Sequence, residues 1–132
     1  MKIMAIDYGD ARTGFAISDR SEFLASPIGT VPERNAERLA DKAAQTAAEY
    51  GAGEIIVGLP INMNGTEGPR AEKCRAFAEL LKERTDLPVR MWDHNETNVR
   101  GKARKAVVDT VAATIILEGY LEYRKKKAKQ AD

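Results

Sequence analysis

The sequence has almost none of the residues that build disulfide frameworks or cysteine-based metal sites. Its 132 residues include one cysteine, Cys74, and one histidine, His94. A single cysteine excludes both an internal disulfide framework and a zinc site made of cysteines. The chain is nevertheless long enough to be held by an ordinary hydrophobic core without such crosslinks.

Long apolar runs are also missing. No segment approaches the roughly 18 apolar residues of a membrane span, and Asp7 comes too early for an N-terminal signal peptide. We therefore expect a cytoplasmic protein with no membrane contact.

The chain has no excess of charge of one sign. Lysine and arginine number 21 and the acidic residues 20, which gives a net charge of +1, so overall charge does not predict a nucleic-acid binder. Hydrophobic residues make up 43% and charged residues 31%, a balance typical of one folded domain and not of a disordered chain.

The basic residues are concentrated at two places. Arg100, Lys102, Arg104 and Lys105 have no acid between them and come shortly before Asp109. A second run, 124–127 followed by Lys129, is read as a solvated tail. This division predicts a single domain over 1–123 and a basic C-terminal tail over 124–132.

Apolar periodicity predicts three strands, then helix, strand, helix, strand and helix. The expected strands cover 2–6, 14–18, 24–31, 54–59 and 88–92, and the expected helices cover 35–50, a segment starting at Pro69, and 103–123. The last helix is expected to present Val108, Val111, Ala112, Ile115 and Leu121 to the core. An antiparallel hairpin followed by β-α-β units predicts an α/β fold, a mixed sheet flanked by helices.

Two aspartates are candidate catalytic residues. Asp7 ends the first strand, where Gly9 permits a tight turn, and its carboxylate is suited to a hard divalent cation. The alternative is that Asp7 only caps the turn. Asp109 interrupts an apolar segment, where a carboxylate is costly unless it has a partner or meets a cleft. The alternative is a first-turn aspartate favoured by the helix dipole.

Two polar segments follow predicted strands. After Trp92 come Asp93, His94 and Glu96, each able to contact a metal ion, although a lone histidine in a polar loop is more often a surface residue. The segment 58–70 holds polar side chains that could donate to phosphate, at the end of a strand where α/β folds bind ligands. They are Asn62, Asn64, Thr66 and Arg70. The alternative is that Asn64-Gly65 only makes a turn.

Three segments together resemble the YqgF/RuvX family of Holliday junction resolvase-like and pre-16S rRNA nucleases, over nearly the whole chain. They are 6–9 with Gly14, 56–66, and 104–109 running into 112–117. The resemblance implies a ribonuclease-H-like fold and metal-dependent cleavage of nucleic-acid phosphodiesters, with Asp7 and Asp109 as two of three acidic ligands.

The third ligand stays open. The family has an Asp-Glu-Arg triplet after the strand, whereas here Asp93 is followed by His94 and Asn95, and the stretch to Asp109 is shorter by roughly three helical turns. Glu96 is favoured over His94, because hard ions prefer carboxylate oxygen.

The resemblance implies a site for two Mg²⁺ or Mn²⁺ ions, roughly 4 Å apart, with Asp7 as the shared ligand. Arg12, Arg70, Lys102, Arg104 and Lys105 would hold the flanking phosphates of structured RNA or branched DNA. A near-neutral chain would bind weakly unless it formed a homodimer or had a partner. The resulting hypothesis is a nuclease that processes the 5' end of pre-16S rRNA or resolves branched DNA. The alternative is a catalytically decayed nucleic-acid or pre-ribosome binding module; an actin-like ATP-binding protein would need a second domain.

Overall fold

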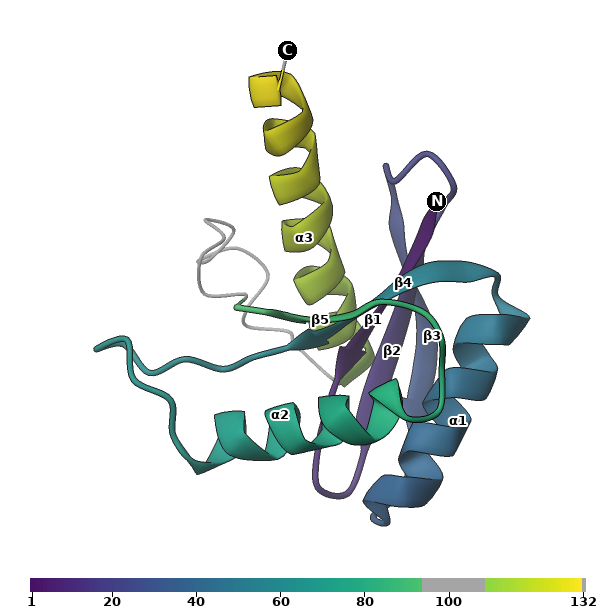
Figure 1. Cartoon of the computed structure of the whole chain (residues 1–132), viewed down its shortest axis with the longest axis vertical. Helices are drawn as coiled ribbons and strands as arrows, with labels where there is room; N and C mark the ends of the chain where they lie inside the picture. The colour runs from purple at the N-terminus through teal and green to yellow at the C-terminus, as the bar shows by residue number, and fades with distance from the viewer. Residues whose placement is uncertain (94–108, 132) are drawn as a thin grey trace.

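The computed structural model describes residues 1–93 and 109–131. Eight elements follow one another in the predicted order (Figure 1). They are β1 (Lys2–Asp7), β2 (Thr13–Ser18), β3 (Ala25–Val31), α1 (Ala36–Glu49), β4 (Ala52–Gly58), α2 (Pro69–Lys82), β5 (Val89–Trp92) and α3 (Asp109–Ala131).

The strands form one sheet in the order β3-β2-β1-β4-β5. β1, β2 and β3 pair antiparallel, whereas β4 pairs parallel with β1 and β5 parallel with β4. The predicted mixed sheet is confirmed. β1 and β4 lie at its centre, which explains why both are apolar on their two faces.

Proline marks the edge of the sheet, as its missing N–H group requires. Pro27 lies in β3, which has a neighbour on one side only. Phe15 pairs with Gly29 and Ala16 with Pro27, so Ile28 is an extra residue and forms a bulge.

The sheet separates two layers of helices. Met4 and Ile6 of β1 belong to the core with α1 and α2, whereas Ile3 and Ala5 belong to the core with α3. This alternation is what a central strand with both faces covered requires. Figure 1 shows α1 to the right of the strands, α2 across their lower half, and α3 rising to the top of the view.

The last helix differs from its prediction. Its described part runs from Asp109 to Ala131, so 124–131 are helical. Of the expected inward face, Leu121 is buried, whereas Ala112 and Ile115 are only half-buried and Ile116 and Leu117 are buried instead. Because nearly every residue from Val111 to Leu117 is apolar, periodicity alone cannot choose between adjacent faces. Val108 and 103–107 lie outside the described residues, as does the side chain of Val111.

A buried carboxylate fixes the second half of α3 against the sheet. Glu54, in β4, is 2% exposed and accepts a hydrogen bond of 2.6 Å from the Tyr120 hydroxyl. Arg90 Nε lies 2.7 Å from the same carboxylate oxygen, and Arg124 Nη1 lies 3.8 Å from the other. These donors offset the cost of burying the charge. Burial, then the bond to Glu54, raises the pKa of Tyr120 to about 12.

Neither α1, α2 nor the described length of α3 is long and apolar enough to cross a membrane.

Candidate active site at the carboxyl edge of the sheet

Three parallel strands end at one edge of the sheet, and two of them lead to an aspartate. Asp7 is the last residue of β1, and Asp93 follows Trp92 at the end of β5; both are half-buried. The end of β4 lies between them, where the Leu59 N–H donates to the Trp92 carbonyl at 2.7 Å. This is the edge at which open α/β sheets bind ligands.

The start of α3 lies toward the same edge. Late in the helix, Arg124 reaches Glu54 near the start of β4 and Glu22, which also binds the amino group of Met1. The helix therefore runs opposite to β1, and its first residue, Asp109, is at the end where β1 finishes (Figure 1). Strand alternation also places Asp7 on the face of β1 that Ile3 and Ala5 present to α3. The elements that carry the two predicted acidic ligands are thus neighbours.

The turn after Asp7 is tight. A Cβ atom at Gly9 would lie 2.1 Å from the carbonyl oxygen of Arg12, so no other residue fits without moving the backbone. The Gly9 N–H donates to Thr13 Oγ1 at 3.1 Å, and Thr13 is fully buried. The predicted tight turn is confirmed, and a buried threonine closes it.

Arg70, at the start of α2, is connected to this turn. Its Nη2 donates to the carbonyl of Tyr8, its Nη1 lies 3.5 Å from Asp10, and the guanidinium lies 5.9 Å from the Tyr8 ring. The Tyr8 ring in turn stacks on Phe77 of α2 at 4.7 Å. Nucleic-acid binding by Arg70 stays a prediction, and its partly exposed guanidinium also contacts the residue that follows Asp7.

Sequence reasoning missed two residues of this cluster. Asp10 also pairs with Lys73 at 3.3 Å. Lys73 follows Arg70 by three residues, a spacing that puts both cations on one face of α2. No local sequence signal gives the contact with Asp10, because 63 residues separate it from Lys73.

The only cysteine lies under this cluster and is not a candidate nucleophile. Cys74 is 2% exposed. Its burial raises the pKa of the thiol, and the charges of Asp7 and Asp10 raise it further against the opposing effect of Arg70. A thiol that resists ionisation is a poor nucleophile.

The loop between β4 and α2 is folded on itself. Asn62 Nδ2 donates to Thr66 Oγ1 at 3.0 Å, which donates to Asn64 Oδ1 at 2.7 Å. Gly65 has φ 86° and its N–H donates to the Asn62 carbonyl at 2.9 Å. The predicted turn at Asn64-Gly65 is therefore present, and phosphate binding by this loop stays a prediction. The loop projects away from the sheet (Figure 1).

Several predicted residues cannot be placed. His94, Glu96, Lys102, Arg104 and Lys105 lie outside the described residues, as does the side chain of Asp109. Within 1–93 and the described part of α3, no three histidine, cysteine or acidic side chains gather closely enough to hold a metal ion. Arg12 is exposed on the turn after Asp7, where it lines a hollow of about 490 Å³ with Arg34 and Arg38.

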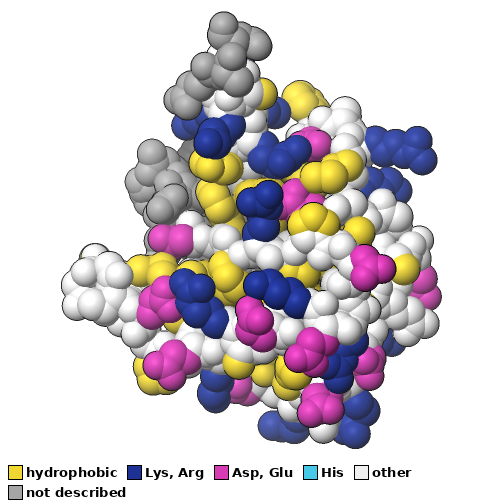
Figure 2. Space-filling model, viewed as in Figure 1, with side chains coloured by type: hydrophobic (Ala, Val, Ile, Leu, Met, Phe, Trp, Pro, Cys, Tyr) yellow, Lys and Arg dark blue, Asp and Glu magenta, His cyan; other side chains and the backbone are white. Residues whose placement is uncertain are grey.

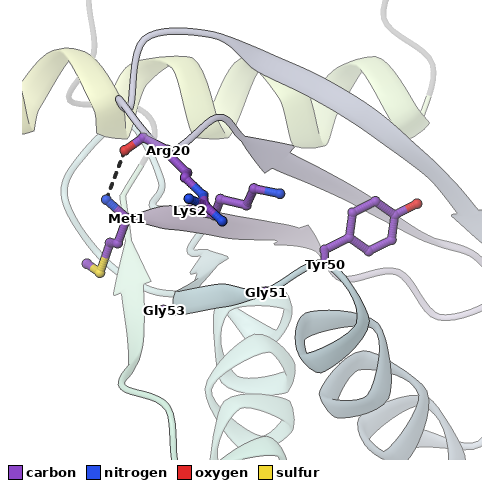
Figure 3. Close-up of a pocket in the computed structure, with 6 residues that line it drawn as sticks. All are labelled: Met1, Lys2, Arg20, Tyr50, Gly51 and Gly53. Atoms are coloured by element: carbon purple, nitrogen blue, oxygen red, sulfur yellow. Dashed lines mark hydrogen bonds between the residues drawn. The ribbon is translucent and has the colours of Figure 1, made fainter.

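A second hollow lies at the opposite edge of the sheet (Figure 3). It has a volume of about 250 Å³, and its floor includes the Met1 amino group, which donates to the Arg20 carbonyl at 3.0 Å. Its lining residues are Met1, Lys2, Arg20, Tyr50, Gly51 and Gly53. No acidic side chain lines it, so it does not compete with the carboxyl edge as a metal site.

The chain was compared with known proteins. The model of the RuvX family, described as "Holliday junction resolvase", matches residues 1–123. A protein of Halothermothrix orenii named "Putative pre-16S rRNA nuclease" is 42% identical over 137 residues, covering 96% of this chain and 98% of that protein. A relative with the same name from Thermoanaerobacter pseudethanolicus is 39% identical over 139 residues, covering 96% and 100%.

Solved structures with low identity share the fold. Thermus thermophilus RuvC in complex with a Holliday junction substrate has a TM-score of 0.65 at 12% identity, covering 95% of this chain and 96% of that one. The fowlpox virus Holliday junction resolvase has a TM-score of 0.56 at 17% identity, covering 93% and 99%. The predicted fold class is confirmed. The chain belongs to the RuvX family and is a nuclease with the ribonuclease-H-like fold.

Proposed function

We propose that the protein is a metal-dependent endonuclease whose active site is built around Asp7. The supporting observation is the position of Asp7 at the end of a central strand, on the face that α3 covers and next to a turn closed by Thr13. Because the backbone around Asp7 is already ordered by this turn, binding a cation to its carboxylate costs little further backbone entropy.

The donor set fits a hard divalent cation. Asp7, Asp93 and the first residue of α3, Asp109, are all carboxylates, the ligands that Mg²⁺ and Mn²⁺ prefer. Asp7 and Asp109, with Glu96 or His94, would hold the ions, and Asp93 is the next candidate. When bound, a pair of such ions activates water and stabilises the leaving oxygen of a phosphodiester.

The protein's own residues would orient the substrate. Arg12 is exposed on the turn after Asp7, and the run Lys102, Arg104 and Lys105 precedes Asp109 in the sequence. These cations bind phosphates on both sides of the cut. The carboxylates would instead hold the metal ions at the reacting phosphate. Asn62 and Asn64 both form hydrogen bonds with Thr66 inside their own loop. Their contribution to substrate binding is therefore to hold the shape of that loop.

The names of the most similar relatives support ribosomal RNA precursor as the substrate, cut at the 5' end of 16S rRNA, and the family description supports branched DNA. A single domain carries this activity, and it extends past the expected boundary at 123, because α3 continues and Arg124 pairs with Glu22 and Glu54. The rival function is a binding module of the same fold with a decayed site. It is favoured by one sequence observation, His94-Asn95 in place of glutamate and arginine.

The test is the Asp7→Asn variant. An amide keeps the shape of the side chain but loses the charge that holds a cation, so cleavage of structured RNA with Mn²⁺ should fall by about 10²-fold or more while thermal unfolding stays close to wild type. Asp109→Asn should behave in the same way. Cleavage retained by Asp7→Asn contradicts the proposed site; a wild-type protein that binds RNA but cuts neither RNA nor junctions with Mn²⁺ favours the binding module.

A further inference from the structure

The last turns of α3 carry an uncompensated positive charge. From 124 to 131 the helix has one arginine, four lysines and no acid. Arg124 is neutralised by Glu22, at 2.6 Å, and by Glu54. The lysines, by contrast, are exposed and form no ion pair with any described residue. They are Lys125, Lys126, Lys127 and Lys129, here called the α3 lysine cluster.

The helix dipole does not account for this cluster. A cation near a helix C-terminus is favoured only within the last turn, and Lys129 is the one basic residue there. Lys125, Lys126 and Lys127 come before that turn. Their charges are also crowded, because Lys125 and Lys126 are four and three residues from Lys129, and like charges at that spacing repel. This repulsion costs stability, and no ion pair with a described residue offsets it.

Exposed aromatic rings hold two of these lysines in position. Lys125 Nζ lies 4.3 Å from the centre of the Phe23 ring, in the β2–β3 loop, and Phe23 is 65% exposed. Lys127 Nζ lies 5.9 Å from the Tyr123 ring, which is itself fixed by Trp92 at 5.0 Å. Cation–π contacts of this kind restrict an otherwise mobile side chain. Figure 2 shows dark blue and yellow side chains gathered together over α3.

We infer that the α3 lysine cluster is a second nucleic-acid contact, which binds the phosphates of a substrate arm away from the cut. The inference rests on the proposed function, because it takes the arm to belong to the nuclease's own substrate. Exposed lysines flanked by aromatic rings are what binding to a nucleic-acid backbone uses. The chain as a whole is nearly neutral, with a net charge of +1, so a local cluster is needed for affinity.

The position of the cluster sets the length of the substrate. From Asp109 to Lys125 there are 16 helical steps, or about 24 Å at 1.5 Å per residue. That distance equals roughly seven nucleotides at 3.4 Å per stacked step. A substrate must therefore extend beyond about seven nucleotides from the cut to reach both places. The protein should prefer long arms over short ones.

The experiment compares two triple variants of the full chain. Lys125, Lys126 and Lys127 are changed to glutamine, and Lys129 is kept because the dipole accounts for it. The control changes Lys42, Arg75 and Lys82 to glutamine; these are exposed residues of α1 and α2, so the net charge is the same as in the first variant. Binding is measured by fluorescence anisotropy without divalent metal, on single-stranded RNAs of about 6 and about 30 nucleotides, lengths chosen to fall on either side of the distance above.

The α3 variant should bind the long RNA about tenfold or more weakly than the control variant and lose about two units of salt slope, since each lost phosphate contact removes roughly 0.7. Binding of the short RNA should be the same for both variants, and the temperature of thermal unfolding should not fall. Equal affinities and slopes on the long RNA overturn the inference. So does equal RNA binding with a selective loss of binding to phosphatidylserine vesicles, which would assign the cluster to a membrane. Because binding is read without metal, failure of cleavage in the wild type would overturn the proposed function and leave this result standing.

Discussion

Arg70 donates a hydrogen bond to the backbone carbonyl of Tyr8, the residue that follows Asp7. The contact joins the first turn of α2 to the turn that leaves β1. We therefore predict that Arg70 positions Asp7, a role distinct from the phosphate-binding role that the sequence predicts.

Replacing Arg70 by lysine separates these two roles. Lysine keeps the charge but cannot contact the Tyr8 carbonyl and Asp10 together through a planar fork. We expect kcat to fall about tenfold, equivalent to about 1.4 kcal/mol, with little change in KM. Steady-state kinetics at saturating metal provide the measurement. A raised KM with an unchanged kcat would return Arg70 to phosphate binding.

The third metal ligand is decided by two single variants. If Glu96 is the ligand, Glu96→Gln should be as damaging as Asp7→Asn, and His94→Ala should be mild. If His94 is the ligand, the order reverses, and activity should decline as pH falls through about 6–7, where imidazole gains a proton. Cleavage rates from pH 5.5 to 8 distinguish the two. Wild-type rates in both variants would leave Asp93 as the candidate.

The basic run before α3 makes a prediction about salt. Changing Lys102, Arg104 and Lys105 to alanine should weaken substrate binding more than it slows cleavage of bound substrate. The log–log slope of affinity against salt should flatten by about two to three units if each residue contacts one phosphate. Titrations on duplex substrate at several salt concentrations measure the slope. An unchanged slope would mean that these residues only solvate the segment.

The bond between Tyr120 and Glu54 predicts a pH dependence of stability. The pKa of Tyr120 is raised to about 12 in the folded protein, against about 10 in the unfolded chain. The folded state therefore holds this proton more tightly, and the resulting stabilisation is complete below pH about 10 and lost as pH rises toward 12. It amounts to about 2–3 kcal/mol.

The Tyr120→Phe variant isolates this effect. Denaturant unfolding at pH 8 and at pH 11 should show a smaller decline in the variant than in the wild type, because other groups titrate equally in both. At pH 8 the variant should be less stable by about 1.5–3 kcal/mol, the range for a hydrogen bond to a charged group. Identical declines would show that the hydroxyl does not hold its proton more tightly in the folded state.

The sequence predicted the fold well where chemistry leaves few alternatives. Pro27 required an edge strand or a bulge and has both, and Pro69 begins α2 as expected. The inward face of α3 was predicted wrongly, because apolar residues at successive positions remove the periodic signal. Burial of Ile116 in place of Ile115 depends on contacts with strands far away in the sequence.

The site was predicted less completely than the fold. Asp7 stood out because an acid at a strand end is unusual, and Gly9 marked the turn. The contact of Arg70 with Tyr8 spans 62 residues, so no local pattern announces it. Lysines 125–127 were read as a tail, because a run of like charge gives no sign that a helix continues through it or that Phe23 lies beside it.

The sheet divides the interior into two hydrophobic clusters, and α3, which carries Asp109, covers the face of β1 on which Asp7 lies. Among the described residues, the cluster under α1 and α2 is the larger, whereas α3 packs over a smaller set on the other face. Amide hydrogen exchange should therefore be faster in α3 than in β1, since fewer apolar contacts must open to release it. Brief detachment of α3 would carry Asp109 away from Asp7 while the sheet stayed folded. The enzyme would then lose activity on warming before its bulk structure melts.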